Sequence, residues 1–355
     1  LGVAVATFLV PIGYARWGLL TIAPLKWWQV AASTAAGTLL ASPYLLALTN
    51  PAVSYRLSFP ALARVAFGVK GALVVTSARA VLGAALTTLT TLAGGFATKE
   101  LWSAISDAFF FDAALPTWAS FAAYVLFWCI QLFFVGIKSQ AKKMRGLGRL
   151  AAVAGAAYVA GSVNAGDATT VWTITARACR GVSAASGGGL TGFAAAAAPV
   201  LDPELWKHAL MVCGTWITLG AMMPDYAQRM QSPKSVALGV TVALPVFAAV
   251  AALIACSMFQ AKSVARYPLL ILACVVTNAG VSLVGPVDAV KRGFNLKSSR
   301  AAAAIVTAIA AIAAYAVLPW QTVATYAAWS LGAGSLFVAP AAGVVIADYW
   351  VLRAR

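Results

Sequence analysis

The stretch GALVVTSARAVLGAALTTLTTLAGGFA occupies residues 71–97 and decides the class of fold. It contains a single charged side chain, Arg79, and its apolar residues do not alternate with polar ones. About 20 consecutive apolar residues cross the hydrocarbon core of a bilayer as a helix, whereas a barrel strand shows about ten residues of alternating polarity. The stretch therefore predicts a transmembrane helix.

The rest of the chain has the same character. Of its 355 residues, 62% are hydrophobic and 10% are charged, and the mean hydropathy is +0.88. Soluble domains contain about 45–50% apolar and about 25% charged residues. A water-soluble globule and a disordered chain are therefore excluded. An all-α integral membrane protein remains, because helices satisfy their own backbone hydrogen bonds in lipid.

Hydropathy windows of about 19 residues divide the chain into ten predicted spans. They are 1–23, 27–48, 71–97, 117–137, 146–163, 205–224, 235–258, 266–285, 300–317 and 327–348. The connection 164–204 is longer and rich in glycine and alanine, which suits a loop or an interfacial helix. The chain begins at Leu1 inside an apolar run, so we expect a truncated start.

The basic residues predict the orientation in the membrane. The formal net charge is +16, from 25 Lys and Arg against 9 Asp and Glu. If the first span runs outward, the inner connections hold 16 basic residues and the outer ones 7, while Arg16 and Arg79 lie within spans. This bias fits the positive-inside rule with both ends cytoplasmic. The charge therefore reflects the topology of a multi-pass membrane protein and does not indicate binding to nucleic acid. We expect the plasma membrane as its location.

Ten spans also predict an internal repeat. Residues 1–163 and 205–355 would each hold five spans, joined by the extracellular or luminal connection 164–204. An odd number of spans per half makes the second half inverted relative to the first, a plan with a binding site near the midplane between broken helices. Pro11 and Gly13 in the first span, and Gly214 and Gly220 in the sixth, predict such breaks.

Four stretches resemble the nucleobase–cation symporter-1 family. FPALARVAFGVKG (59–71) matches the family signature F-P-x-x-x-R-x-x-F-G-x-x-G. The other three are LKWWQ (25–29), WITL with PDY (216–219 and 224–226) and GVVIADYW (343–350), all in the family's order. The resemblance implies the leucine-transporter type of five-plus-five inverted repeat. The two further helices usual in the family would follow Arg355 and are expected to be absent.

The resemblance also implies a function. Members are secondary transporters of purines, pyrimidines, hydantoins, allantoin or related heterocycles, driven by sodium or protons and working by alternating access. The flat substrate lies between a third-span and a sixth-span tryptophan, and a glutamine and an asparagine bind its edge.

The family's substrate positions carry over onto five residues of this sequence. The sixth-span tryptophan is Trp216, and the backbone of Thr215 beside it would contact the substrate where the helix breaks. Leu86 replaces the third-span tryptophan, Thr90 the glutamine and Ser282 the asparagine. We therefore expect a roomier, less polar site, and hypothesise a bulkier, purine-like substrate.

The family's sodium positions on the eighth span correspond to Ala273, Val276 and Thr277. Their i, i+3, i+4 spacing places them on one helix face. The Ala273 carbonyl and the Thr277 hydroxyl offer oxygen, whereas Val276 offers no side-chain oxygen. The prediction is a sodium ion held by Ala273 and Thr277, with a proton as the alternative coupling ion and no other cofactor.

Other ionisable side chains are interpreted as structural. We place Asp225, Asp288, Asp348 and His208 at the ends of spans as interfacial groups, and assign Arg16 and Arg79 to packing or snorkelling.

An alternative function is a transporter-derived receptor or scaffold with little transport. An enzyme is disfavoured, because the chain has one histidine and no cluster of catalytic groups, and no phosphate-binding loop is present. The expected partners are a small heterocycle and the lipid bilayer, and the sequence leaves the oligomeric state open.

Overall fold

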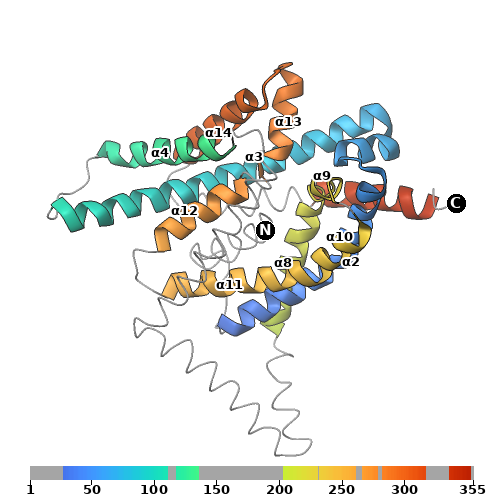
Figure 1. Cartoon of the computed structure of the whole chain (residues 1–355), viewed down its shortest axis with the longest axis horizontal. Helices are drawn as coiled ribbons and strands as arrows, with labels where there is room; N and C mark the ends of the chain where they lie inside the picture. The colour runs from blue at the N-terminus through green and yellow to red at the C-terminus, as the bar shows by residue number, and fades with distance from the viewer. Residues whose placement is uncertain are drawn as a thin grey trace, which may run out of the picture.

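The computed structural model describes residues 27–110, 117–135, 203–230, 232–260, 266–278, 282–316 and 336–352, and every element within these ranges is helical (Figure 1). The helices are α2 (Trp27–Tyr55), α3 (Phe59–Phe110), α4 (Thr117–Val135), α8 (Pro203–Gly220), α9 (Pro224–Ala227), α10 (Pro233–Leu238), the π-helical turn η1 (Gly239–Ala243), α11 (Leu244–Gln260), α12 (Arg266–Thr277), α13 (Val284–Gly293), α14 (Ser299–Ala316) and the apolar helix Leu336–Leu352, which ends in the π-helical turn η3 (Asp348–Leu352).

Three of the described helices are long and apolar enough to cross a membrane. They are Gln29–Tyr55, Phe59–Asp107 and Pro233–Ala252, and four shorter apolar helices accompany them. The predicted spans 1–23 and 146–163, almost all of the connection 164–204, and residues 327–335 of the tenth span lie outside the described residues. The number of ten spans therefore stays a prediction.

Helix α3 is much longer than the predicted span 71–97. It runs from Phe59 to Phe110 with one break in its dihedral angles, at Gly68 (φ 69°, ψ −177°). This backbone conformation is nearly exclusive to glycine, which explains the glycine of the F-P-x-x-x-R-x-x-F-G motif. The 42 residues after the kink span roughly 60 Å, about twice the hydrocarbon thickness of a bilayer. The helix therefore continues well beyond the span predicted from hydropathy.

The predicted eighth span, 266–285, is not one helix. Helix α12 ends at Thr277 and α13 begins at Val284; between them Asn278 and Ser282 are π-helical, and the Leu283 N–H donates to the Asn278 carbonyl (3.2 Å), while residues 279–281 lie outside the described residues. Pro286 cannot donate the backbone bond that a continuous helix would require, but it is accommodated in the first turn of a new helix. Figure 1 shows that α13 then runs across the direction of α3.

The predicted break at Gly214 to Trp216 in the sixth span is also wrong. Helix α8 continues unbroken to Gly220, and the chain turns only at residues 221–223, before Pro224 begins α9. A single glycine is tolerated within a helix. Gly214 faces open space, so nothing there forces a break. Gly220, by contrast, lies against the ring of Tyr44, where an added Cβ would approach Cε1 to 2.9 Å.

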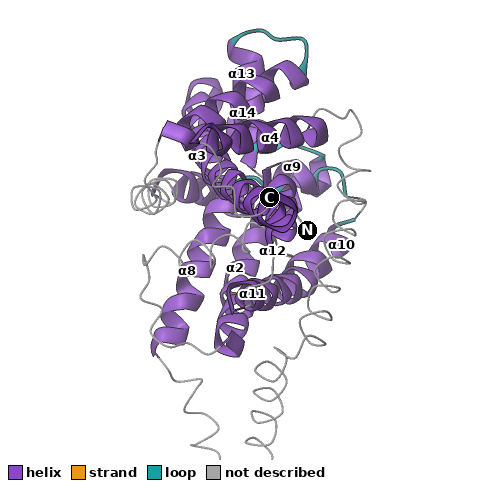
Figure 2. Ribbon diagram, turned by 90° about the vertical axis from the view of Figure 1, so that its left-hand side faces the viewer, coloured by secondary structure: helices purple, strands orange, loops and turns teal. Residues whose placement is uncertain are grey.

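The helices pack in two groups (Figures 1 and 2). Helices α2, α8, α9 and α11 pack together, and α3, α4, α12, α13 and α14 form the second group. Each group combines helices from both predicted repeats, so the sequence halves are interleaved in space. The division into inverted five-helix repeats remains a prediction.

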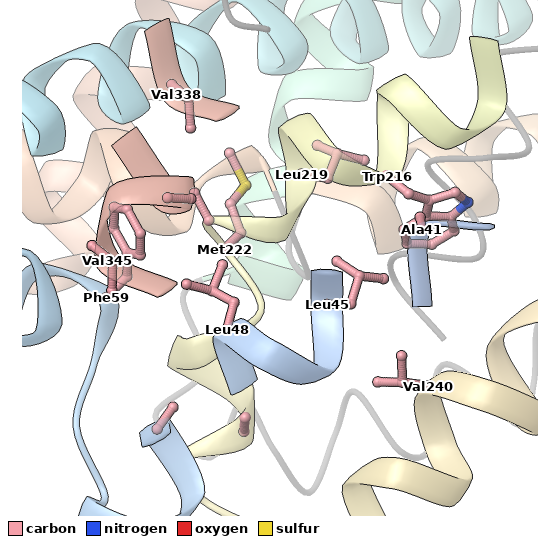
Figure 3. Close-up of a cluster of buried hydrophobic side chains, with 14 of the residues drawn as sticks. Ala41, Leu45, Leu48, Phe59, Trp216, Leu219, Met222, Val240, Val338 and Val345 are labelled. Atoms are coloured by element: carbon pink, nitrogen blue, oxygen red, sulfur yellow. The ribbon is translucent and has the colours of Figure 1, made fainter. Parts of the chain in front are cut away.

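One apolar cluster connects the two groups (Figure 3). Ala41, Leu45 and Leu48 of α2 face Trp216 and Leu219 of α8. Further members come from α3 and from the apolar helix Leu336–Leu352, namely Phe59, Leu62, Val75, Leu82, Val338, Ala342 and Val345. Lipid tails are as apolar as these side chains, so close van der Waals packing, aided by small residues such as Ala41, stabilises the contact.

A buried ion pair joins the groups next to this cluster. Arg79 of α3 is 1% exposed, and its Nη2 lies 2.6 Å from Oδ2 of Asp225 in α9, a close pair that falls short of hydrogen-bond geometry. Its Nη1 donates to the Ala221 carbonyl (3.2 Å) in the turn after α8. Oδ1 of Asp225 accepts the Phe59 N–H (3.1 Å), and the guanidinium lies 5.4 Å from the Phe59 ring centroid.

The pair corrects one expectation and confirms another. Asp225 is buried and is not an interfacial group. Packing and snorkelling were the two roles expected for Arg79. Its side chain is packed inside the protein and does not snorkel.

We predict that Gly37→Val destabilises the protein by about 1–3 kcal/mol. A Cβ at Gly37 of α2 would press against the Ala209 carbonyl oxygen of α8 and lie 2.8 Å from the Val212 Cβ. Gly214→Val is the matched control, because no atom lies within 4 Å of its added Cβ. Thermal unfolding in detergent measures both variants. Equal melting temperatures would contradict the close approach of α2 to α8.

We predict that Arg79→Met destabilises the protein by about 3–5 kcal/mol, because it leaves the Asp225 carboxylate buried without its cation. Adding Asp225→Asn removes that charge and keeps an acceptor for the Phe59 N–H, so the double variant should recover most of the loss. Arg64→Met changes an exposed arginine and is the control. Failure of the second substitution to restore the melting temperature would show that the ion pair is not the stabilising contact.

Candidate substrate site

Two of the predicted substrate residues, Leu86 and Thr90, belong to the segment of α3 from Gly83 to Thr91, and a third, Ser282, lies against it. Leu86 packs against the apolar cluster that contains Trp216 of α8. Thr90 donates to Oδ1 of Asn278 at the end of α12. Gly83 lies so close to Ser282 that an added Cβ would approach the Ser282 carbonyl oxygen to 2.5 Å. Thr90 and Gly83 of α3 thus lie against Asn278 and Ser282, whereas Leu86 and Trp216 share a large apolar cluster.

Trp216 is 0% exposed, yet its Nε1 has no hydrogen-bond partner. Buried indole N–H groups ordinarily find an acceptor, and leaving one without a partner costs about 1–3 kcal/mol. The neighbouring Thr215 does not fit its predicted role. It lies within continuous α8, and its hydroxyl donates to the Met211 carbonyl (2.9 Å), so its backbone is not at a helix break.

Ser282 is the second predicted residue with an unsatisfied polar atom. It is fully buried in the turn between α12 and α13, and its Oγ has no hydrogen-bond partner. Gly83 and Pro286 lie on either side of its backbone, where an added Cβ at Gly83 would come within 2.6 Å of the Pro286 Cδ. The absence of a side chain at Gly83 therefore lets α3 approach this turn.

A chain of buried polar side chains extends from Thr90. Nδ2 of Asn278 donates to Oε1 of Gln131 in α4 (3.2 Å), and Nε2 of Gln131 donates to Oγ1 of Thr91 (3.1 Å). All four side chains are buried. Because each amide is bonded at both ends, the Asn278 oxygen is fixed toward Thr90 and its nitrogen toward Gln131. The chain ties α3, α4 and α12 together and sets the amide orientation beside the predicted site.

Asn278 and Gln131 were missed in the sequence reading. The family comparison directed attention to Ser282, four residues after Asn278, and the apolar surroundings of Gln131 suggested only a span. The sequence did contain a signal, namely an Asn and a Gln within apolar spans. Burying a carboxamide there without a hydrogen-bond partner costs free energy, so such a residue is a candidate functional residue by default. Which partner each amide would find depends on helix packing, which the sequence does not specify.

The predicted cation residues lie on the buried face of α12. Ala273, Val276 and Thr277 are all buried, and the Thr277 hydroxyl donates to the Ala273 carbonyl (2.8 Å). The Thr277 hydroxyl oxygen keeps lone pairs, whereas the Ala273 carbonyl accepts both this hydroxyl and, within α12, the Thr277 N–H. Val276 contributes no side-chain oxygen. The remaining ligands were expected from the first span, which lies outside the described residues.

His208 is another correction. It was interpreted as an interfacial group, but it is buried in α8, and its Nδ1 lies 2.6 Å from the Ser33 Oγ of α2. The pair forms a polar contact between α2 and α8.

The fold is similar to that of a solved transporter. Mhp1, described as a nucleobase-cation-symport-1 family transporter in a closed conformation with bromovinylhydantoin bound, superposes with a TM-score of 0.62 at 16% identity, covering 99% of this chain and 78% of Mhp1. Its inward-facing conformation gives a TM-score of 0.59 at 17% identity, with 99% and 75% covered. The likeness confirms the all-α membrane transporter fold, and with it a multi-pass membrane protein.

Two sequence comparisons identify the family. "Purine-uracil permease NCS1" of Arabidopsis thaliana is 31% identical over 132 residues, or 36% of this chain; the match spans about a fifth (22%) of that relative's length. A family model described as "Permease for cytosine/purines, uracil, thiamine, allantoin" matches residues 7–275, which is more than half of the chain. The chain therefore belongs to this permease family, the nucleobase–cation symporters whose motifs its sequence resembles.

Proposed function

We propose that the protein is a secondary active transporter that moves a nucleobase-like heterocycle across the membrane by alternating access, coupled to a cation. The observation that carries the proposal concerns two of the four buried side-chain atoms that lack a hydrogen-bond partner in the described residues, Nε1 of Trp216 and Oγ of Ser282. Both belong to residues that the family resemblance singled out on other grounds, and Ser282 lies beside Gly83 of α3. A ligand with hydrogen-bonding groups on its edge would satisfy them.

The surrounding side chains suit a flat ring. An indole offers a π face for stacking, which contributes about 1–3 kcal/mol per base in other settings. Leu86 would cover the opposite face by apolar contact alone. The hydroxyl group of Ser282 has no partner and would bind the edge, whereas Thr90 and Asn278 bond to each other and would offer the edge only the second N–H and the remaining lone pairs.

The substrate class follows from the changed residues. Leu86 and Thr90 occupy less space than tryptophan and glutamine, so the site accommodates a ring system larger than uracil or hydantoin. The sixth-span tryptophan is retained as Trp216. A two-ring purine, with more stacking area on the one retained tryptophan, is the substrate that these residues favour.

Sodium is the proposed coupling ion. The Ala273 carbonyl and the Thr277 hydroxyl form adjacent oxygen ligands on α12. Asn278 follows Thr277 directly and bonds to Thr90, so an ion held by α12 would lie one residue away from the proposed substrate contacts. Proton coupling is the alternative, with His208, buried between α8 and α2, as one titratable candidate.

We predict that Trp216→Phe and Ser282→Ala each weaken purine binding about tenfold or less, because each removes one hydrogen bond worth about 0.5–1.5 kcal/mol. Trp216→Phe retains an aromatic face, which limits damage to the core. Thr98→Val is the control, since this buried hydroxyl already donates to the Gly94 carbonyl on α3. Calorimetry with purified protein measures the affinities of adenine, guanine, uracil and hydantoin.

Unchanged affinity in both variants would refute the substrate site. Vesicle counterflow of the same compounds then tests transport itself. Tight binding without counterflow would indicate a receptor and would contradict the proposed transporter.

We predict that replacing external sodium by potassium abolishes concentrative uptake in vesicles. We also predict that Thr277→Val raises the sodium concentration needed for half-maximal uptake severalfold, and that it changes the uptake rate at saturating sodium by a smaller factor. The variant removes one of two oxygen ligands on α12. Thr241→Val, which changes a hydroxyl bonded to the Ala237 carbonyl in the seventh span, is the control. Proton coupling would be established instead if uptake is unchanged when sodium is replaced and is abolished by a protonophore.

A further inference from the structure

The turn that connects α13 to α14 forms one end of the molecule. Figure 2 shows this connection projecting beyond the helices that it joins, and Figure 1 shows that α13 runs across the direction of α3. The opposite end of α13 is fixed, because Gly285 packs against Arg79, where an added Cβ would lie 3.3 Å from the Arg79 carbonyl oxygen. Helix α13 therefore packs on α3 near its beginning and ends at the turn that projects beyond the helices.

The conformation of the turn is defined by hydrogen bonds. The Leu296 N–H donates to the Lys291 carbonyl (2.9 Å), and the Asn295 N–H donates to the Arg292 carbonyl (3.4 Å). Asn295 has a positive φ of 48°. Together these features form a Schellman motif, the left-handed closure that commonly ends a helix. The turn consequently presents the side chains around it in a fixed arrangement.

These side chains are basic and aromatic. Phe294, at the C-cap of α13, is 71% exposed. Arg292 and Lys297 are exposed on either side of it, and Lys291 is half-buried. The acidic group close by is Asp288, one turn earlier, and burial raises the pKa of its carboxyl. We call the set Lys291, Arg292, Phe294 and Lys297 the basic turn.

The level of the basic turn relative to the bilayer follows from α14. Its apolar stretch Ala301–Ala313 begins four residues after Lys297. Ile305, Ile309 and Ile312 are exposed at i, i+4 and i+7, so they form one face of this helix. In a membrane protein such a face contacts lipid tails. The basic turn therefore lies where that lipid-facing helix emerges from the hydrocarbon, at the level of the headgroups.

We propose that the basic turn binds anionic phospholipid headgroups of the inner leaflet, with Phe294 inserted at the boundary between headgroups and acyl chains. Three cations gathered around one exposed aromatic ring complement a phosphate-rich surface that carries net negative charge. Aromatic rings are favoured at this depth. The proposal uses the membrane location of the chain and, for the choice of leaflet, its predicted orientation, and it is independent of what the protein transports.

The test uses the full chain in phosphatidylcholine vesicles containing a trace of photoreactive phosphatidylglycerol or of photoreactive phosphatidylcholine. After irradiation, mass spectrometry maps the labelled peptides. We expect the peptide around Phe294 to be labelled preferentially by phosphatidylglycerol. Combining Lys291→Gln, Arg292→Gln and Lys297→Gln should lower this labelling about tenfold or more and leave phosphatidylcholine labelling unchanged. Phe294→Ser should lower labelling by both lipids.

Lys234→Gln, an exposed lysine at the start of α10, is the control for a general effect of charge. An unchanged melting temperature shows that the variants remain folded. Equal labelling of the peptide by the two lipids would overturn the proposal. So would chemical cross-linking of Lys297 to a second copy of the chain in place of lipid, because the basic turn would then be a protein interface.

Discussion

The ion pair between Arg79 and Asp225 constrains the arrangement of the described helices more than any other polar contact. A charge taken out of water costs several kcal/mol unless a partner and hydrogen bonds replace its hydration. Asp225 replaces it by contacting Arg79 and by accepting the Phe59 N–H, and Arg79 also donates to the Ala221 carbonyl. Helix α3, the turn after α8, and α9 must therefore all be in place before either charge is stable.

The kink at Gly68 makes this arrangement possible. Phe59 and Arg79 belong to the same helix, and in a straight helix 20 residues would separate them by roughly 30 Å. The guanidinium nevertheless lies 5.4 Å from the Phe59 ring centroid. The left-handed conformation at Gly68 folds the first turns of α3 back toward its later part. The family motif around Phe59, Arg64 and Gly68 is thus a structural element that closes one end of the ion-pair site.

Polar contacts differ in kind within and between the two helix groups. The chain Thr90, Asn278, Gln131 and Thr91 links three helices of one group by directional hydrogen bonds. Between the groups the contacts are mainly apolar, through the cluster around Trp216 and Leu45. Directional hydrogen bonds favour a rigid group of helices. Apolar surfaces lose less interaction energy when one slides a short distance over the other. The proposed substrate contacts lie at the edge of the bonded unit, where it meets the apolar contact.

The sequence predicted the fold class and the helix positions well, because apolar length is a direct consequence of bilayer thickness. It predicted helix ends poorly where other forces decide them. Hydropathy does not show that α3 continues to Phe110, nor that a new helix, α13, has Pro286 in its first turn. Gly214 suggested a helix break, but α8 continues through this residue without one. A glycine indicates a possible break, and only packing determines whether it is used.

For the candidate site, residue types could be predicted better than partners. Trp216, Leu86, Thr90 and Ser282 were identified from the family resemblance, and of these Leu86 and Thr90 belong to α3 while Ser282 lies against Gly83 of the same helix. The partner of Arg79 could not be identified, because Asp225 is 146 positions away and reads as the end of a span. Ion pairs and amide networks depend on which helix faces which, and this information is distributed over the whole packing of the chain.

The amide network also changes how the substitutions at the site should be interpreted. Considered alone, Thr90 offers fewer hydrogen-bonding groups than the glutamine that the family has at this position. In the structure, however, Thr90 bonds to Asn278, whose amide is oriented by Gln131 from a different helix. The capacity for hydrogen bonds is therefore retained and displaced from α3 toward α12 and α4. Under the proposed function, the missing glutamine enlarges the site while these two amides keep its polar character, and this combination suits a larger ring with a hydrogen-bonding edge.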